Sequence, residues 1–282
     1  MEYILNSEGV KTTQPAPTKA TGNDYRGYYA DVDGDGTVDG IIYADLNKSV
    51  SGQWYYGPYS YEKQTGLKEC VISEGKYTEG KFGEKEIIRI KFGSRGNARF
   101  YVMALSDFRS GSFETGNGAC GNGVDCTEGT YYWYNNATGH MDPKITQDEF
   151  GTGSNNTKLM IKKWKAAGTN EGYSNSPQNN QDIWKHIQGE YAKGWYIPSR
   201  GECGAFADYF KQRTENGLTH NYESGSYVAN SGNYKNLYGL SGWYWSSSQY
   251  DASSAWRAHF TSGTILSNGV NFDYYVRLGA TF

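Results

Sequence analysis

The 282-residue sequence is poor in the features on which several protein classes depend. It has four cysteines, too few for a disulfide-built scaffold of this length. No apolar run is long enough to span a bilayer. Charged residues make up 20% of the chain and the net charge is −3, so there is no general basic surface of the kind that neutralises nucleic-acid phosphates. We therefore expect neither membrane insertion nor nucleic-acid binding.

Signatures of catalysis are also missing. The four histidines, His140, His186, His220 and His259, lie far apart, and none belongs to an H-E-x-x-H motif. There is no G-x-S-x-G elbow, phosphate-binding loop or dinucleotide fingerprint. We interpret His186 as a packed, hydrogen-bonded histidine. A helix dipole could activate Cys203, but we interpret it as a small buried residue. The sequence thus predicts no enzyme and no catalytic residue.

The N-terminal segment "MEYILNSEGVKTTQPAPTKATGND" lacks the basic start and apolar run of a secretory signal. The protein then stays where it is made, is carried on a virion, or has lost a leader. Thr, Pro and Ala dominate from Lys11 to Asn23, so we expect residues 1–23 to be a flexible lead-in. With no internal repeat and no later linker, residues 24–282 are expected to form a single domain.

Tyrosine, glycine and tryptophan are plentiful instead, with 26, 37 and 8 residues, and the mean hydropathy is −0.75. Binding surfaces of antibodies use the same residues, because Tyr and Trp give large contact areas with few torsions to fix. An ordinary loop-rich β protein has a similar composition. Composition therefore leaves both interpretations open.

Local patterns predict an α+β fold with short, mostly antiparallel strands, two or three helices and long loops. "EKEIIRIKFG", "ARFYVMAL" and "GTYYWYNN" are typical of strands. "QDIWKHIQGEYAKG" and "PSRGECGAFADYFKQRTENG" predict helices, and "TKLMIKKWKAA" a third. Ser199 and Glu202 match a capping box, and Asn216-Gly217 would end that helix.

One acidic stretch, "DVDGDGTVDG", has the spacing of a calcium loop. Asp31, Asp33, Asp35 and Asp39 occupy the first, third, fifth and ninth places, with glycine at the sixth. The twelfth place is Ile42 instead of a bidentate glutamate, and no helix leads in. The sequence leaves two alternatives, a structural calcium site or an empty, solvated Asp-Gly turn.

Cys120 and Cys126 in "CGNGVDC" are close enough to close a small loop in an oxidising compartment. A pair of free thiols fits as well. Their spacing is wrong for a zinc ribbon, and no histidine pair lies nearby.

The last third of the chain contains three landmark segments. They are Gly194-Trp195 followed by Pro198-Ser199, the run "YWSSS" at Tyr244 to Ser248, and Tyr275-Val276-Arg277 before Phe282. This pattern resembles the variable proteins of diversity-generating retroelements, which have a C-type-lectin-like fold. "YRGYYADVDGDGTVDGIIYADL" also resembles N-terminal regions of gut-microbe and phage members. The related formylglycine-generating enzymes have a catalytic cysteine pair near the C-terminus, which has no counterpart after Cys203.

The resemblance implies that an error-prone reverse transcriptase rewrites adenine-containing codons, mostly of the AAC type. Changing the first two bases of such a codon cannot give Lys, Glu, Gln, Met or Trp. From Tyr250 to Phe282 there is no Lys, Glu, Gln or Met, and the single Trp256 is a landmark. A strand-rich tail would also disfavour Lys and Glu.

We expect the variable region, about 244–282, to hold a rigid backbone and to display exchangeable side chains. Trp245, Trp256, Phe260, Val276 and Phe282 are the expected anchors, with turns at Gly263 and Gly269. The expected ligand-binding residues face outward, with the first two at the border: Tyr244, Gln249, Asp251, Ala252, Ser253, Ser254, Arg257, Ala258, His259, Thr264, Ile265, Leu266, Ser267, Val270, Asn271, Phe272, Asp273 and Tyr274.

The resulting hypothesis is a hypervariable, non-enzymatic binding protein displayed on a cell or virion. Its expected partner is a protein or a surface polymer on a target cell, because a broad surface suits macromolecules better than an enclosed pocket does. A calcium-dependent lectin is one alternative, although the Glu-Pro-Asn and Gln-Pro-Asp tripeptides of sugar-binding members are absent. An enzyme of the formylglycine-generating type is the other. The ligand and the oligomeric state are not predicted.

Overall fold

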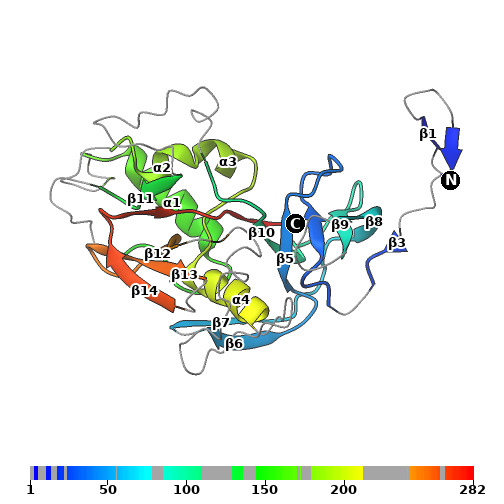
Figure 1. Ribbon diagram of the computed structural model, residues 1–282, viewed down its shortest axis with the longest axis horizontal. Helices are drawn as coiled ribbons and strands as arrows, with labels where there is room; N and C mark the ends of the chain where they lie inside the picture. The colour runs from blue at the N-terminus through cyan, green and yellow to red at the C-terminus, as the bar shows by residue number, and fades with distance from the viewer. Residues whose placement is uncertain are drawn as a thin grey trace.

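The structure is a computed structural model, and Figure 1 shows its elements. It describes residues 3–5, 11–13, 18–21, 24–54, 56–77, 85–109, 129–135, 144–169, 172, 179–211, 240, 242–260 and 264–282. Several sequence predictions lie outside these residues: those for Cys120, Cys126, His140, His220, Asn216, Gly217 and Gly263.

The larger sheet of the described residues, called the central sheet below, has seven strands. Its strand order is β16-β10-β5-β4-β9-β8-β3, and β4 and β9 are its parallel pair. The bounds are β3 Thr18–Lys19, β4 Tyr29–Asp31, β5 Gly40–Asp45, β8 Cys70–Tyr77, β9 Lys85–Ile90, β10 Phe100–Ala104 and β16 Gly279–Thr281. β9 and β10 confirm two predicted strands. Thr18 and Lys19 pair with β8, so the end of the expected lead-in joins this sheet.

A second sheet of five strands carries most of the C-terminal segment, in the order β11-β15-β12-β13-β14. Its strands are β11 Thr130–Tyr132, β12 Tyr244–Gln249, β13 Ser254–His259, β14 Thr264–Gly269 and β15 Asp273–Tyr275. Two hairpins complete the strands, β1 Tyr3–Leu5 with β2 Lys11–Thr13, and β6 Val50–Trp54 with β7 Gly57–Tyr61. The mixed α+β class is therefore confirmed.

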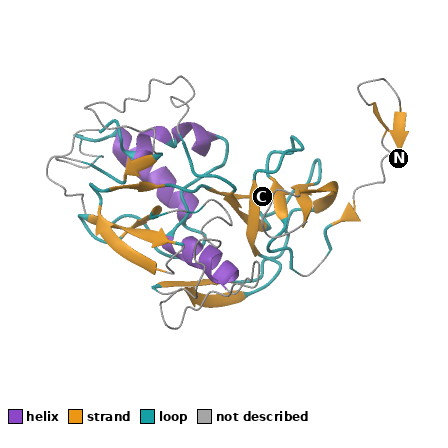
Figure 2. Cartoon of the chain, in the orientation of Figure 1, coloured by secondary structure: helices purple, strands orange, loops and turns teal. Residues whose placement is uncertain are grey.

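The described residues form four helices: α1 Gly153–Lys165, α2 Ile183–His186, α3 Gln188–Ala192 and α4 Arg200–Lys211. All three predicted helical segments are helical, but the segment at 181–194 forms two short helices that meet at Ile187. Helix α4 contacts both the central sheet and the five-stranded sheet. Figure 2 shows strands of these sheets on either side of the long helices. No helix among the described residues is long and apolar enough to cross a membrane.

The predicted capping box begins α4. Glu202 accepts a hydrogen bond from the Ser199 amide at 2.6 Å, and the Glu202 amide donates to Ser199 Oγ at 3.2 Å. Burial raises the pKa of Glu202 to about 7, although its hydrogen bonds with Ser199 oppose the shift. A Cβ at Gly153 would collide with the Glu202 carboxylate, so glycine is required there. The box therefore also fixes the start of α1 against α4.

The three landmark segments meet in space. Tyr196 bridges to Gly279, and the Ser247 amide donates to the Pro198 carbonyl at 2.8 Å. Ser248 Oγ accepts a bond from the Arg200 amide at 2.9 Å, which ties β12 to the first residue of α4. Residues that are far apart in the sequence thus form one hydrogen-bonded junction around the start of α4.

Two apolar clusters lie on opposite faces of the five-stranded sheet. One face contributes Tyr244, Ala258, Phe260 and Ile265 to a cluster with α4 and the β6–β7 hairpin. The other contributes Trp245 and further residues to a cluster with α1 and α2. All six residues of β12 are buried as a result. A strand covered on both faces leaves no exposed side chains, so display falls to β13, β14 and the following turn.

Candidate functional site

The expected binding region forms one part of the five-stranded sheet. Strand register places Trp245 opposite Arg257 and Arg257 opposite Leu266, so these side chains share a face. We call the open part of this face the C-terminal surface and define it by Trp243, Arg257, His259, Leu266, Asn268, Phe272 and Tyr274. The cluster with α1 and α2 covers Trp245, Ala255 and Val270, and Tyr274 packs against it.

Five of the eighteen expected binding residues are buried, so the prediction that they lie at the surface is wrong for them. They are Tyr244, Gln249, Ala258, Ile265 and Val270. Ala258 and Ile265 are cross-strand partners that point into the cluster with α4, and Val270 belongs to the cluster with α1. Strand alternation sends these side chains inward while their neighbours stay outside.

The two residues expected at the border of the surface form hydrogen bonds within the fold. Tyr244 donates its hydroxyl hydrogen to Asp107 at 3.3 Å. The backbone amide of Gln249 donates to Thr146 Oγ1 at 2.6 Å, and the side-chain oxygen of Gln249 accepts a hydrogen bond from the Ile145 backbone amide. Exchanging either residue would break bonds inside the fold.

The other thirteen residues remain accessible. Exposed ones are Asp251, Leu266, Asn271, Phe272 and Asp273. Half-buried ones are Ala252, Ser253, Ser254, Arg257, His259, Thr264, Ser267 and Tyr274. Of the expected anchors, Trp245, Phe260, Val276 and Phe282 are buried as predicted, and Trp256 is half-buried.

Arg257 lies at the centre of the C-terminal surface between two aromatic rings. Its guanidinium carbon is 3.7 Å from the Trp243 ring centre and 4.6 Å from that of Tyr274. Burial lowers the pKa of Arg257, while Tyr274 opposes the shift through charge and a hydrogen bond. Each ring face attracts the cation electrostatically, so the arginine is fixed in position before any partner arrives.

Further contacts order the surrounding side chains. The Trp243 ring also packs against His259, with ring centres 4.9 Å apart. Asn268 donates its side-chain amide to the Tyr274 hydroxyl oxygen at 2.5 Å. Leu266, the cross-strand partner of Arg257, is 39% exposed, and Phe272, in the turn after β14, is 51% exposed. This combination can bind a partner by apolar contact, stacking, charge and hydrogen bonds.

Sequence reasoning missed Trp243 and Asn268. Trp243 precedes Trp245 by two residues, and two such residues of a strand lie on the same face, so alternation could have indicated it. Asn268 follows the expected run 264–267 directly, but only the fold shows its bond to Tyr274.

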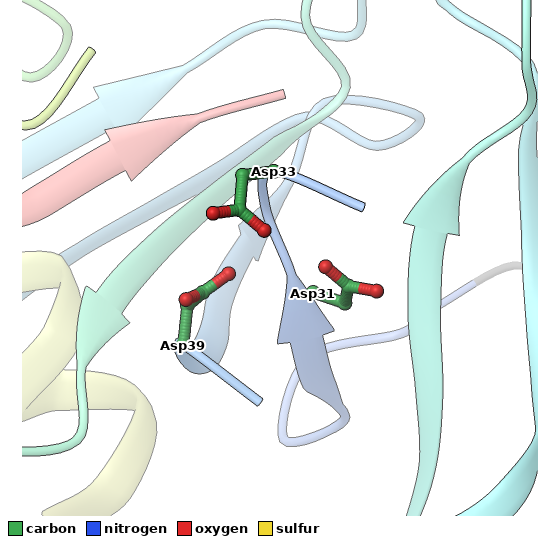
Figure 3. A group of neighbouring side chains, drawn as sticks. All are labelled: Asp31, Asp33 and Asp39. Carbon is green, nitrogen blue, oxygen red and sulfur yellow. The ribbon is translucent and has the colours of Figure 1, made fainter. Parts of the chain in front are cut away.

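The acidic loop is a second candidate site. Each of Asp31, Asp33 and Asp39 offers one carboxylate oxygen, and these oxygens all lie within 4.8 Å of one another. Figure 3 shows the carboxylates of Asp33 and Asp39 turned toward each other beside β4, which ends at Asp31. Asp35, the fourth expected ligand, is not part of this group and instead accepts a bond from the Thr37 amide at 2.7 Å.

Backbone amides shape this loop. Asp31 accepts bonds from the Gly34 and Gly36 amides at 2.7 and 3.0 Å, and Asp39 accepts one from Val32 at 2.6 Å. Gly34 and Gly36 both have positive φ values, of 83° and 91°. Burial raises the pKa of Asp39, and the charges of Asp33 and Asp31 add to the effect. Three oxygens suit a hard cation but are fewer than the six to eight that calcium takes.

The reactive residue types singled out in the sequence have ordinary surroundings. Cys203 is buried, and burial raises the pKa of its thiol well above the usual range. The His186 ring shares a 2.8 Å hydrogen bond with the Asn180 carbonyl and packs against Tyr131, and burial lowers its pKa. Both interpretations, a buried cysteine and a packed, hydrogen-bonded histidine, are confirmed.

A scan against protein-family models, a search of curated proteins and a search of solved structures each found no match to this chain.

Proposed function

We propose that this chain is a hypervariable binding protein of the retroelement-diversified type, with a C-type-lectin-like fold, and that its C-terminal surface binds a macromolecular partner. The partner is a protein or a surface polymer on a target cell, and the chain acts on the surface of a cell or virion. The proposal includes no catalytic step.

The arrangement around Arg257 carries this proposal. A cation held between Trp243 and Tyr274 is the cross-strand partner of the exposed Leu266, and Phe272 is exposed in the turn that follows β14. Tyr, Trp and Arg are the residues that most often dominate binding energies at interfaces. Their ordering before binding also reduces the entropy that association costs.

The burial pattern narrows the set of positions proposed to vary. Surface substitutions usually change stability by about 0.5 kcal/mol or less, whereas large-to-small core substitutions cost about 2–5 kcal/mol. Substitutions at the thirteen accessible residues should therefore cost less stability than substitutions at the five buried ones. We propose the accessible set as the diversified positions.

The flanking DNA tests diversification. We expect a near-copy of the codons for residues 244–282 beside a reverse-transcriptase gene, with adenines at codons for accessible residues such as Leu266 and Asn271. The codon for Val270 should carry no adenine in its first two places, and the codon for Ile265 only the first-place adenine that every isoleucine codon has. A locus without the near-copy, or with adenines concentrated at the buried positions, would contradict the proposal.

Binding is tested with two displayed libraries of equal size. One randomises accessible positions, such as 266, 271 and 272, and the other randomises the buried positions 258, 265 and 270. The first should remain protease-resistant and yield binders to surface proteins or polymers of target cells. The second should be digested. Equal digestion of both libraries would contradict the assignment of a tolerant surface.

We further propose that the acidic loop holds a structural calcium ion through Asp31, Asp33 and Asp39. The gathering of their oxygens within 4.8 Å supports this. The ion would offset repulsion between the carboxylates, and it lies outside the binding surface. A sugar array with and without EDTA separates this role from that of a lectin, because EDTA-sensitive binding of monosaccharides would favour the lectin.

A further inference from the structure

Two aromatic rings hold the charge of Arg257 on the C-terminal surface. The guanidinium carbon lies 3.7 Å from the centre of the Trp243 ring and 4.6 Å from that of Tyr274. An aromatic face attracts a cation, but it carries no counter-charge and offers no pair of oxygen acceptors to the fork of N–H donors. The rings therefore position the cation and leave its preferred acceptor, a carboxylate, to another group.

Arginines elsewhere in the described chain have both rings and carboxylates. Four of them lie over an aromatic ring and also pair with an aspartate, at nitrogen–oxygen distances from 2.7 to 3.6 Å: Arg26 with Asp24, Arg99 with Asp45, Arg200 with Asp148, and Arg277 with Asp107. Ring contact thus does not replace the ion pair at these four sites. Arg257 has the rings, so the question is where its carboxylate comes from.

The described acidic residues nearest in sequence to Arg257 and Tyr274 are engaged elsewhere. Asp273 precedes Tyr274 in β15, so alternation turns it to the other face, where it accepts a hydrogen bond from Thr130 Oγ1 at 2.9 Å. Asp251 accepts a hydrogen bond within its own turn. Burial lowers the pKa of Arg257, and Tyr274 is the one described group that opposes the shift. Among the described residues, none supplies a carboxylate to this guanidinium.

The side chain of Leu266 gives the cation an apolar neighbour. Leu266 is the cross-strand partner of Arg257 and is 39% exposed. Such partners have Cβ atoms about 4.5–5.5 Å apart, so a molecule that meets the guanidinium also reaches Leu266. Phe272, in the turn after β14, is a second exposed apolar residue of the surface. A ligand gains most here if it carries an apolar group beside its anion.

A protein segment fits this combination better than an acidic polysaccharide does. The carboxylates of a polysaccharide are surrounded by hydroxyl groups, so that polymer has little apolar area to place on Leu266. An acidic residue beside an apolar one in a protein offers both groups at once. Aspartate and glutamate side chains also accept two parallel hydrogen bonds from one arginine.

We propose that the C-terminal surface of this chain binds an acidic protein segment, with an aspartate or glutamate of the partner on Arg257 and an adjacent apolar side chain on Leu266. The assignment rests on the proposed function, because the surface is the same. Position 257 is among those proposed to vary, so the preference for an acidic partner belongs to this version of the surface.

A displayed library of random peptides, selected against the immobilised full chain, tests the partner. The wild type should enrich peptides in which Asp or Glu stands next to an apolar residue. Arg257→Met should lose this enrichment, and Arg257→Glu should enrich peptides with Lys or Arg instead. Binders without an acidic residue, or binding of polygalacturonate with no acidic peptide, would overturn the acidic partner and leave the proposed function standing. A selection without any binder would contradict both.

Matched changes locate the contact. Replacing the acidic residue of a selected peptide by its amide should weaken binding to the wild type about five- to thirtyfold, between the effects of an exposed ion pair and of a buried charge-assisted hydrogen bond. This change leaves the protein intact, so misfolding cannot mimic it, and it should have no effect on binding to Arg257→Met. Arg95→Met removes the same charge from the exposed loop between β9 and β10 and should leave binding unchanged. Equal effects of Arg95→Met and Arg257→Met, or equal weakening by the peptide change in wild type and Arg257→Met, would overturn the assignment.

Discussion

Ile265 and Leu266 are adjacent apolar residues of β14 that occupy opposite environments, and replacing each by alanine tests the division between fixed and exchangeable positions. Ile265 is 1% exposed and packs with Tyr244 and Ala258. It lies so close to β7 that a Cβ at Gly57 would collide with its Cδ1. Leu266 is 39% exposed on the C-terminal surface.

The structure sets the size of the difference. Ile265→Ala removes fully buried carbon atoms and leaves a cavity, so we expect it to lower the unfolding free energy by about 2–5 kcal/mol. Leu266→Ala removes partly hydrated atoms and should cost roughly 0.5–1 kcal/mol. Both variants exchange a large strand residue for alanine, so differences in strand propensity largely cancel.

Urea unfolding, followed by tryptophan fluorescence, measures both changes as shifts of the midpoint at unchanged slope. In a thermal scan, Ile265→Ala should lower the Tm by roughly 5–15 °C and Leu266→Ala by roughly 1–4 °C. Equal losses, or a larger loss for Leu266→Ala, would refute the assignment of inward and outward positions in β14. The proposed set of diversified residues would then fail with it.

Three further predictions concern buried and acidic groups. If the acidic loop binds calcium, calcium at about 100 times its Kd should stabilise the wild type by about 2.7 kcal/mol. Asp39→Asn should lose most of this gain but be no less stable than the wild type in EDTA, because burial and neighbouring charges raise the pKa of Asp39. Equal calcium-induced shifts of the Tm in both proteins would contradict this prediction. Glu202 has a folded-state pKa of about 7, above its ordinary 4.5, so its contribution to stability is complete below pH 4.5 and is lost as the pH rises through 7. As the pH rises through 7, the free energy of unfolding from urea titrations should therefore fall by about 1–3 kcal/mol more in the wild type than in Glu202→Gln. Parallel profiles of the two proteins would count against a buried, titrating Glu202. Asp45 is 1% exposed and accepts hydrogen bonds from Arg99 at 3.0 and 3.1 Å, so Arg99→Met should destabilise the protein by about 3–5 kcal/mol by leaving the buried carboxylate without its charge partner. Adding Asp45→Asn should restore part of this loss. A double mutant no more stable than Arg99→Met would argue against a stabilising ion pair.

Local signals in the sequence predicted several elements well. Ser199 and Glu202 form the expected capping box at the start of α4, since such a motif depends on residues only three apart. The helix in "TKLMIKKWKAA" and the strands in "EKEIIRIKFG" and "ARFYVMAL" are present because their apolar spacing matches their periodicity.

Which side chains point outward was not predictable in the same way. "TIL" contains two adjacent apolar residues, and alternation states only that they face opposite sides. The side facing α4 and Gly57 is decided by contacts with residues about 60 and 200 positions earlier, so no local pattern distinguishes Ile265 from Leu266. The position of Arg257 between two rings was also not predictable, because Trp243 precedes β12 and Tyr274 belongs to β15.

Strand β16, which follows the proposed diversified positions, pairs with β10 of the central sheet. Phe282 is buried, and its carbonyl oxygen accepts bonds from the Arg99 and Phe100 amides at 2.7 and 3.0 Å. Every codon of the proposed diversified positions, which end at Tyr274, is thus translated before β16, the strand that completes the central sheet. A rewritten gene with a frameshift or stop codon in that stretch would encode a chain whose β10 lacks its outer neighbour. Such copies should misfold and be degraded, so the architecture itself would remove faulty products of an error-prone polymerase.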